Sequence, residues 1–290
     1  KQIEIFKGPQ SSIYGPNAMA GVINLISKNP SKKKALDITT SLYSNNGSSY
    51  NVTSSLKLSE KLFSRFTLST NYTDGFIKNI SDTNDPKSNT NSKDEALFRI
   101  KFFYQPNIYS SILLTTYFID LNNKYDVWTP DNNGFTTFSD FQGYDTQNTK
   151  AFSVNSNFDL PNSKLTSITA YSDNTMFYSY DADWGNLEYW DSEYGYNEDS
   201  EYYFGAYEYT DATNRERQTF SQEFRIKNNL KHNVTLTSGI YYSKTKETDR
   251  RDGWLFAGSA TNIHSIFDIS NYAVYAQISY PITEKIFIFI

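Results

Sequence analysis

The chain has 290 residues, enough for one or two domains, and a formal net charge of −5 at pH 7. It contains no cysteine, which excludes disulfides and thiolate metal sites, and no basic stripe with interleaved aromatic residues, which argues against a nucleic-acid partner. No run approaches 18 apolar residues, so a transmembrane helix is excluded, but a mean hydropathy of −0.61 does not exclude a membrane barrel, which exposes only alternate strand residues to lipid.

Residues 3–30 lack the rhythm of strands and loops that follows them. Two Gly-Pro pairs, Gly8-Pro9 and Gly15-Pro16, predict turns. Small residues at 18, 20 and 21 allow close backbone approach, and residues 22–26 predict a buried strand. We therefore expect two units, a compact one over 1–35 and an extended β-structure over 36–290.

Period-2 alternation of apolar and polar residues predicts eleven strands in the remainder of the chain. They lie near 37–44, 51–59, 63–72, 95–104, 110–120, 150–159, 164–173, 217–227, 233–243, 270–280 and 285–290. The fourth, for example, sets Phe98, Ile100 and Phe102 against Arg99 and Lys101. Each is close to the roughly 9 to 11 residues that a tilted strand needs to cross a bilayer.

The gaps between these strands alternate between short turns and long polar loops. The turns lie at 59–61, 105–108, 160–163, 228–232 and 281–284, and the loops near 73–94, 121–149, 174–216 and 244–269. Alternation within strands fits a soluble all-β protein equally well. Strand length, aromatic residues at strand ends and the alternation of loop lengths together favour an all-β membrane protein, a partial antiparallel transmembrane β-barrel with its long loops outside.

The segment 3–30 resembles the end of the plug domain of TonB-dependent outer-membrane receptors of the siderophore type. The resemblance rests on a basic residue before Gly-Pro, then Tyr-Gly, a small-residue turn and Gly-Val-Ile-Asn. These residues are Lys7, Gly8, Pro9, Tyr14, Gly15, Ala18, Gly21, Val22, Ile23 and Asn24. The sequence departs from the family in Ala20, where a glycine is common, and in Lys7, where arginine is usual.

The resemblance implies a plug that precedes and enters a barrel of 22 strands, of which this chain would hold about half. It implies the outer membrane of a Gram-negative bacterium, lipid around the barrel, and energy from the TonB complex through a segment upstream of Lys1. We expect a fragment, because Lys1 has no preceding Met and the last predicted strand stops at Ile290.

One plug–barrel contact is suggested by analogy with the family. The stretch 215–226 resembles a common barrel strand of these receptors, and its Glu223 could pair with Lys7 of the plug. The alternative is that Glu223 pairs across the lumen with Arg225 or another basic side chain.

The loop near 174–216 is the candidate substrate-binding segment, because aromatic residues interleave there with carboxylates. The selected residues are Tyr178, Tyr180, Asp183, Trp184, Tyr189, Trp190, Tyr194 and Tyr196. Aromatic rings stack on planar or sugar-like ligands, and carboxylates favour cations, so a neutral or cationic complex would fit this loop better than an anionic one. The alternative is a solvated loop with a local aromatic cluster. Loop calcium is conceivable but unsupported, and we expect neither a cofactor nor a resident metal.

The predicted function is energised uptake of a scarce, bulky solute, with a small-molecule iron chelate such as a ferric siderophore as cargo. Vitamin or glycan cargo by the same mechanism and a surface-binding or adhesion barrel stay open. A passive porin is disfavoured by the plug segment. We expect no enzyme, because the two histidines, His232 and His264, lie in separate connections and no catalytic constellation is present.

Overall fold

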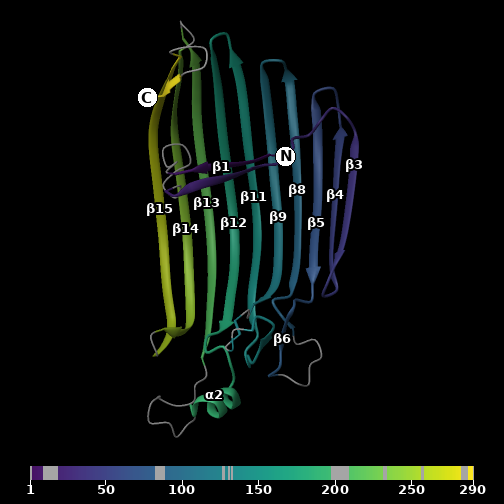
Figure 1. The fold of residues 1–290 in the computed structure, drawn as a ribbon. Helices are drawn as coiled ribbons and strands as arrows, with labels where there is room; N and C mark the ends of the chain where they lie inside the picture. Colours follow the sequence, from purple (N-terminus) through teal and green to yellow (C-terminus); the bar gives the residue numbers. More distant parts are fainter. Residues whose placement is uncertain are drawn as a thin grey trace.

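The computed structural model describes residues 2–8, 19–81, 89–125, 128–129, 131, 133–196, 209–230, 234–255, 258–281 and 287–289. A large antiparallel sheet of eleven strands dominates it, and strands adjacent in the sheet follow one another along the chain (Figure 1). Its strands are β3 (Ala35–Tyr43), β4 (Gly47–Lys57), β5 (Leu62–Thr73), β8 (Lys93–Asn107), β9 (Ser110–Tyr125), β11 (Gly143–Leu160), β12 (Ser163–Asp181), β13 (Thr210–Asn229), β14 (Thr235–Leu255), β15 (Gly258–Pro281) and β16 (Phe287–Phe289).

The eleven predicted strands are therefore confirmed in number and order, but most are longer than predicted. The predicted long loop at 244–269 is wrong: β14 continues to Leu255 and β15 begins at Gly258. The alternation of apolar and polar residues fades in this part of the two strands, although their backbone pairing continues as far as Leu255 and Gly258, with an irregularity between Arg251 and Gly253. The other three long gaps are shortened in the same way, to 74–92, 126–142 and 182–209.

The two faces of the sheet are inverted relative to a soluble protein. Large apolar side chains on one face are open, as in Ile38 at 66% and Val274 at 85% exposure. The opposite face, which we call the inner face, buries polar residues such as Thr67, Lys101 and Thr115. Among the described residues, buried polar and charged side chains far outnumber the buried apolar ones, Phe63, Ile77 and Ala182. A soluble sheet would bury its apolar face, so this arrangement matches a barrel wall with lipid outside.

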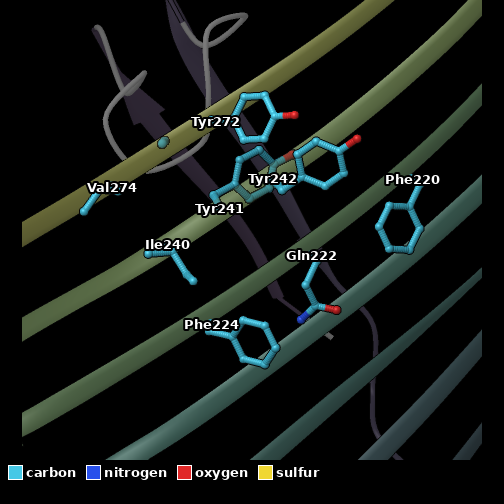
Figure 2. Close-up of a pocket in the computed structure, with 9 residues that line it drawn as sticks. Phe220, Gln222, Phe224, Ile240, Tyr241, Tyr242, Tyr272 and Val274 are labelled. Carbon is cyan, nitrogen blue, oxygen red and sulfur yellow. The ribbon is translucent and has the colours of Figure 1, made fainter.

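A hollow of about 530 Å³ on the outward face illustrates this surface (Figure 2). Phe220, Phe224, Ile240 and Tyr272 are among the residues that line it. Its polar residue, Gln222, accepts a hydrogen bond from Thr169 Oγ1 and donates to Ser167 Oγ and to the Glu223 carbonyl. The amide is thus satisfied within the wall, so this hollow offers an apolar surface suited to lipid rather than polar groups that would orient a ligand.

The N-terminal segment forms a separate hairpin of β1 (Gln2–Lys7) and β2 (Gly21–Ile26), which lies across the strands of the large sheet (Figure 1). Glycine is required at position 21, because a Cβ there would lie 2.6 Å from the Phe6 carbonyl oxygen. The predicted burial of 22–26 is wrong for Ile23 and Leu25, which are 69% and 71% exposed. The reason is that no described residue packs over that face of the two-stranded hairpin.

The remaining elements lie at the end of the sheet where the long connections emerge (Figure 1). Three short strands form a second sheet in the order β10 (Thr136–Thr137), β6 (Ile77–Asn79) and β7 (Asn89–Thr90). One helix, α2 (Leu187–Tyr194), follows β12. No helix among the described residues has the length and apolar character needed to span a membrane.

The inverted faces predict different costs for charge at neighbouring positions of β11. Val154 lies on the outward face between Leu114 and Thr169, and Asn155 lies on the inner face. We expect Val154→Arg to lower the free energy of unfolding by about 2–4 kcal/mol if it lies near the bilayer centre, because the guanidinium must enter lipid, and Asn155→Arg to change it little. Denaturant titration of the full-length protein in lipid bilayers measures both, and equal costs would contradict the assignment of faces.

Candidate functional site

The connections at the helix-bearing end of the sheet pack against one another and form one unit, which we call the loop cap (described residues of 74–92, 126–142 and 182–209). Asn79 Nδ2 donates to the Ser139 carbonyl at 2.7 Å, and Asn186 Nδ2 donates to Ser81 Oγ at 2.8 Å. The Phe138 and Tyr189 rings stack with their centroids 4.6 Å apart. Three segments distant in sequence are thereby fixed to one another at this end of the sheet.

Helix α2 forms inside the loop that was predicted to bind substrate. Asn186 is its N-cap and accepts a hydrogen bond from the Tyr189 N–H at 2.7 Å. Gly195 ends the helix in the left-handed conformation, with φ 66°, and its N–H bonds to the last carbonyls. The sequence contained this signal, an Asn before and a Gly after an eight-residue segment, but it is short and lacks a clear apolar stripe.

Asp183 organises the loop cap from within. Its carboxylate is 1% exposed and accepts hydrogen bonds from the Gly185 N–H at 3.0 Å, from Trp190 Nε1 at 3.2 Å and from the Tyr209 N–H. Burial raises the pKa of the Asp183 carboxyl, although these hydrogen bonds oppose the shift. Asp181, equally buried, accepts from the N–H groups of Asp183 and Trp184. Both carboxylates are therefore structural, and neither faces solvent as a ligand-binding group.

The selected aromatic residues form two clusters and one separate pair rather than a single cluster. Around α2, Trp190 packs on Tyr189 and Tyr194, with centroids 5.0 Å and 5.2 Å away, and Tyr194 stacks on Tyr196. Trp184 lies apart from this cluster and packs on Trp128 at 5.3 Å.

Tyr178 and Tyr180 belong to the second cluster, on the inner face of the wall. Their rings meet each other and Tyr125 of β9, with the Tyr125–Tyr178 centroids 4.8 Å apart. We call Tyr125, Tyr178 and Tyr180 the tyrosine cluster. Tyr125 was missed because its partners are more than fifty residues away, and only the strand register brings them together.

A ladder of ion pairs continues this inner surface across β13 and β14. It consists of Arg251 with Asp211 at 2.6 Å, Arg215 with Asp249 at 2.7 Å, and Arg217 with Glu247. In each pair the guanidinium is more exposed than the carboxylate, as in 37% for Arg251 against 2% for Asp211. On this inner face, the guanidinium groups therefore lie closer to solvent than the carboxylates with which they pair. The signal in the sequence is that two segments carry opposite charges at alternate positions, Arg215 and Arg217 in one and Glu247 and Asp249 in the other.

The predicted partners Lys7 and Glu223 are not joined in the structure. Glu223 Oε1 accepts from Arg225 Nη2 at 2.7 Å and Nε at 2.9 Å, and from the Tyr275 hydroxyl, while Lys7 is exposed. Gly239 makes room for this arrangement, because a Cβ there would lie 2.5 Å from the Tyr275 ring. The alternative partner named from the sequence, Arg225, is the one that the structure describes.

Of the plug motif, Lys7, Gly8, Gly21, Val22, Ile23 and Asn24 lie at the hairpin of β1 and β2. Asn24 Nδ2 donates to Glu4 Oε2 at 2.9 Å across it. Pro9, Tyr14, Gly15 and Ala18 lie outside the described residues. Within the described part of the chain, no three His, Asp or Glu side chains converge where they could hold a metal ion.

Known structures share this arrangement although their sequences have diverged. The ferric yersiniabactin uptake receptor FyuA of Yersinia pestis matches over 97% of this chain and 50% of its own, with a TM-score of 0.61 and 14% identity. The outer-membrane ferripyoverdine receptor of Pseudomonas aeruginosa matches over 99% of this chain and 40% of its own, with a TM-score of 0.75 and 11% identity.

 The copper transporter OprC matches over 97% of this chain and 40% of its own, with a TM-score of 0.64 and 14% identity. The chain has the fold of a TonB-dependent outer-membrane receptor. It spans half or less of the length of these structures. No family model matches the sequence, and no curated protein matches it.

Removal of the Asp183 carboxylate should disorder the loop cap while leaving the eleven-stranded sheet folded. Asp183→Ala leaves three buried N–H donors without their acceptor, each at a cost of about 1–3 kcal/mol. We expect faster hydrogen exchange in residues 182–195 and unchanged exchange in β11 and β12. Glu193→Ala, at an exposed position of α2, is the matched control and should leave the exchange unchanged.

The raised pKa of Asp183 predicts that the loop cap loses stability as the pH rises. Below the ordinary value of 3.8 the carboxyl is protonated in both the ordered and the disordered cap. Above it the disordered cap releases the proton first, so stability falls until the pH passes the raised pKa of the ordered cap. The fluorotryptophan resonance of Trp190 should report this loss, and Asp183→Asn should flatten the pH profile. A cap that gains order over this range would contradict the sign.

Proposed function

We propose that the chain is part of a TonB-dependent receptor in the outer membrane of a Gram-negative bacterium, which takes up an iron complex such as a ferric siderophore. The observation that carries the proposal is the β1–β2 hairpin, which lies across a wall whose apolar face is turned outward (Figure 1). A plug inside a barrel makes transport gated rather than diffusive. The energy would come from the TonB complex acting on a segment upstream of Lys1, and lipid would surround the barrel.

The cargo site in this proposal is the inner surface formed by the tyrosine cluster and the ion-pair ladder, beneath the loop cap. Tyrosine rings offer stacking surface and hydroxyl groups, and the more exposed guanidinium groups offer hydrogen-bond donors to oxygen atoms of a chelate. These features suit an oxygen-rich iron complex of moderate size. The similarity to OprC, a copper transporter, means that the fold alone does not select iron.

The acidic loop was expected to repel anionic complexes, but several of the carboxylates behind that expectation are buried. Asp181, Asp183 and Asp211 are 1%, 1% and 2% exposed, and their hydrogen bonds go to the loop cap and to Arg251. Exposed carboxylates remain on α2, at Glu188, Asp191 and Glu193. In this proposal a bound complex meets the guanidinium-faced ladder as well as these exposed carboxylates, and an anionic ferric siderophore is compatible with the ladder.

Uptake of labelled ferric chelates by cells that carry the full-length gene tests the function. We expect uptake that is lost when the TonB-interacting segment is deleted, while binding to the cell surface persists. Binding without energised uptake in the intact receptor would favour an adhesion protein instead.

Substitution of two tyrosines on opposite faces of the sheet, Tyr178 of β12 and Tyr144 of β11, tests the cargo site. Tyr178→Ala removes a ring from the inner cluster, and we expect roughly tenfold weaker binding of the transported chelate, since an aromatic contact contributes about 0.5–1.5 kcal/mol beyond its buried area. Tyr144→Ala removes a ring from the outward face at a similar height, because Tyr144 pairs with Ser179, and should leave binding unchanged. Equal effects of the two substitutions would contradict the site.

A further inference from the structure

Lys101 of β8 joins the barrel wall to the end of the plug segment. Its side chain lies on the inner face, and the residue is only 5% exposed. Its ammonium group donates to the Ser27 carbonyl at 3.1 Å and to Asn29 Oδ1 at 3.0 Å. Ser27 directly follows β2, so the contact holds the chain at the point where it leaves the hairpin.

The charged residues next to Lys101 are cations, so its described hydrogen-bond acceptors are the neutral oxygens of Ser27 and Asn29. Arg65 is its register partner on β5, and Arg99 lies two residues away on the same face of β8. Arg65 donates to Ser55 Oγ and Arg99 to Thr67 Oγ1. Among the described residues, none of these three cations forms an ion pair with a carboxylate, and the plug residues 9–18 contain no acidic residue. A buried ammonium needs acceptors, which favours retention of residues 27–29 at this position.

The register of the hairpin gives this contact a mechanical consequence. Gln2 pairs with Ile26 at one end of the hairpin, and Lys7 pairs with Gly21 at the other. The upstream end of β1 therefore lies beside the downstream end of β2, which is the end that Lys101 holds. Tension applied upstream of Gln2 would break the β1–β2 pairs one after another, starting beside the fixed point.

We propose that Lys101 is a positioning residue that anchors the downstream end of the plug hairpin to the wall, so that tension separates β1 from β2 instead of moving both strands together. The source of that tension rests on the proposed function. Without the anchor, the load passes through residues 28–34 to the start of β3 at Ala35.

Single-molecule pulling of the full-length receptor in lipid tests the anchor. Handles are attached at Gln2→Cys and at Ile108→Cys, an exposed position in the turn between β8 and β9. In the otherwise unchanged receptor we expect two steps. The hairpin, about 25 residues, should extend by roughly 85 Å, and rupture of the Lys101 contact should then release about eight residues, or roughly 28 Å.

Four variants distinguish the anchor from a general effect of charge or folding. Lys101→Met should merge the two steps into one, whereas Lys101→Arg, which retains hydrogen-bond donors, should keep the second step. Arg65→Met removes a neighbouring cation whose described hydrogen bond goes to Ser55 and should also keep the second step. Asn29→Ala removes one acceptor from the plug side and should lower the force of the second step even if Lys101→Met fails to fold.

The proposal is overturned if Lys101→Met retains the second step, or if Arg65→Met abolishes it as completely as Lys101→Met does. The measurement needs no TonB complex. Failure of energised uptake in cells would therefore refute the proposed function, whereas the pulling experiment would still decide whether Lys101 anchors the hairpin.

Discussion

The structure depends on the continuous backbone hydrogen bonding between neighbouring strands. In lipid an unpaired N–H or C=O group costs several kcal/mol, so a chain can cross only if each strand finds a partner on both sides. The long registers of β11 to β15 meet this requirement. Because the backbone groups pair with one another, the side chains of the outward face need not supply hydrogen bonds to them. Where a polar side chain does occur there, as at Gln222, its hydrogen bonds go back into the wall.

The same physical requirement governs the charges of the inner face. Glu223, Asp211 and Asp249 each lie against a guanidinium group, and Asp183 is surrounded by N–H donors. In the fold, these carboxylates therefore already have hydrogen-bond or ion-pair partners, which the sequence alone does not show. The segment that follows the β1–β2 hairpin contacts Lys101 through a carbonyl and an amide oxygen, and Glu223, which family analogy had suggested as the contact, pairs with Arg225 instead.

The wall could be predicted from the sequence because its determinants are local. Alternation at positions such as Phe98, Arg99 and Ile100 identifies a strand and both of its faces at once. The end of β14 after 243 and the start of β15 before 270 were missed, because apolar and polar residues no longer separate onto two faces there, although the backbones still pair.

The site was harder to predict because its determinants are distant in sequence. The tyrosine cluster needs the register of three strands, and the loop cap needs Asn79 and Asn186 to find acceptors in other loops. The sequence identified Tyr178 and Trp190 as members of one loop but could not show that they belong to different surfaces. The division into 1–35 and 36–290 stays a prediction.

The extension of the strands beyond the predicted crossing places the loop cap away from the lipid. In β12, which leads into the loop cap, about eight residues continue past the predicted end at 173, roughly 26 Å along the strand and somewhat less in height because barrel strands are tilted. The Debye length in physiological salt is only about 8 Å, so the charge of the lipid headgroups is screened before it reaches the cap. In the proposed function, a solute arriving there would be selected by the side chains of the loop cap and not by the surface potential of the membrane.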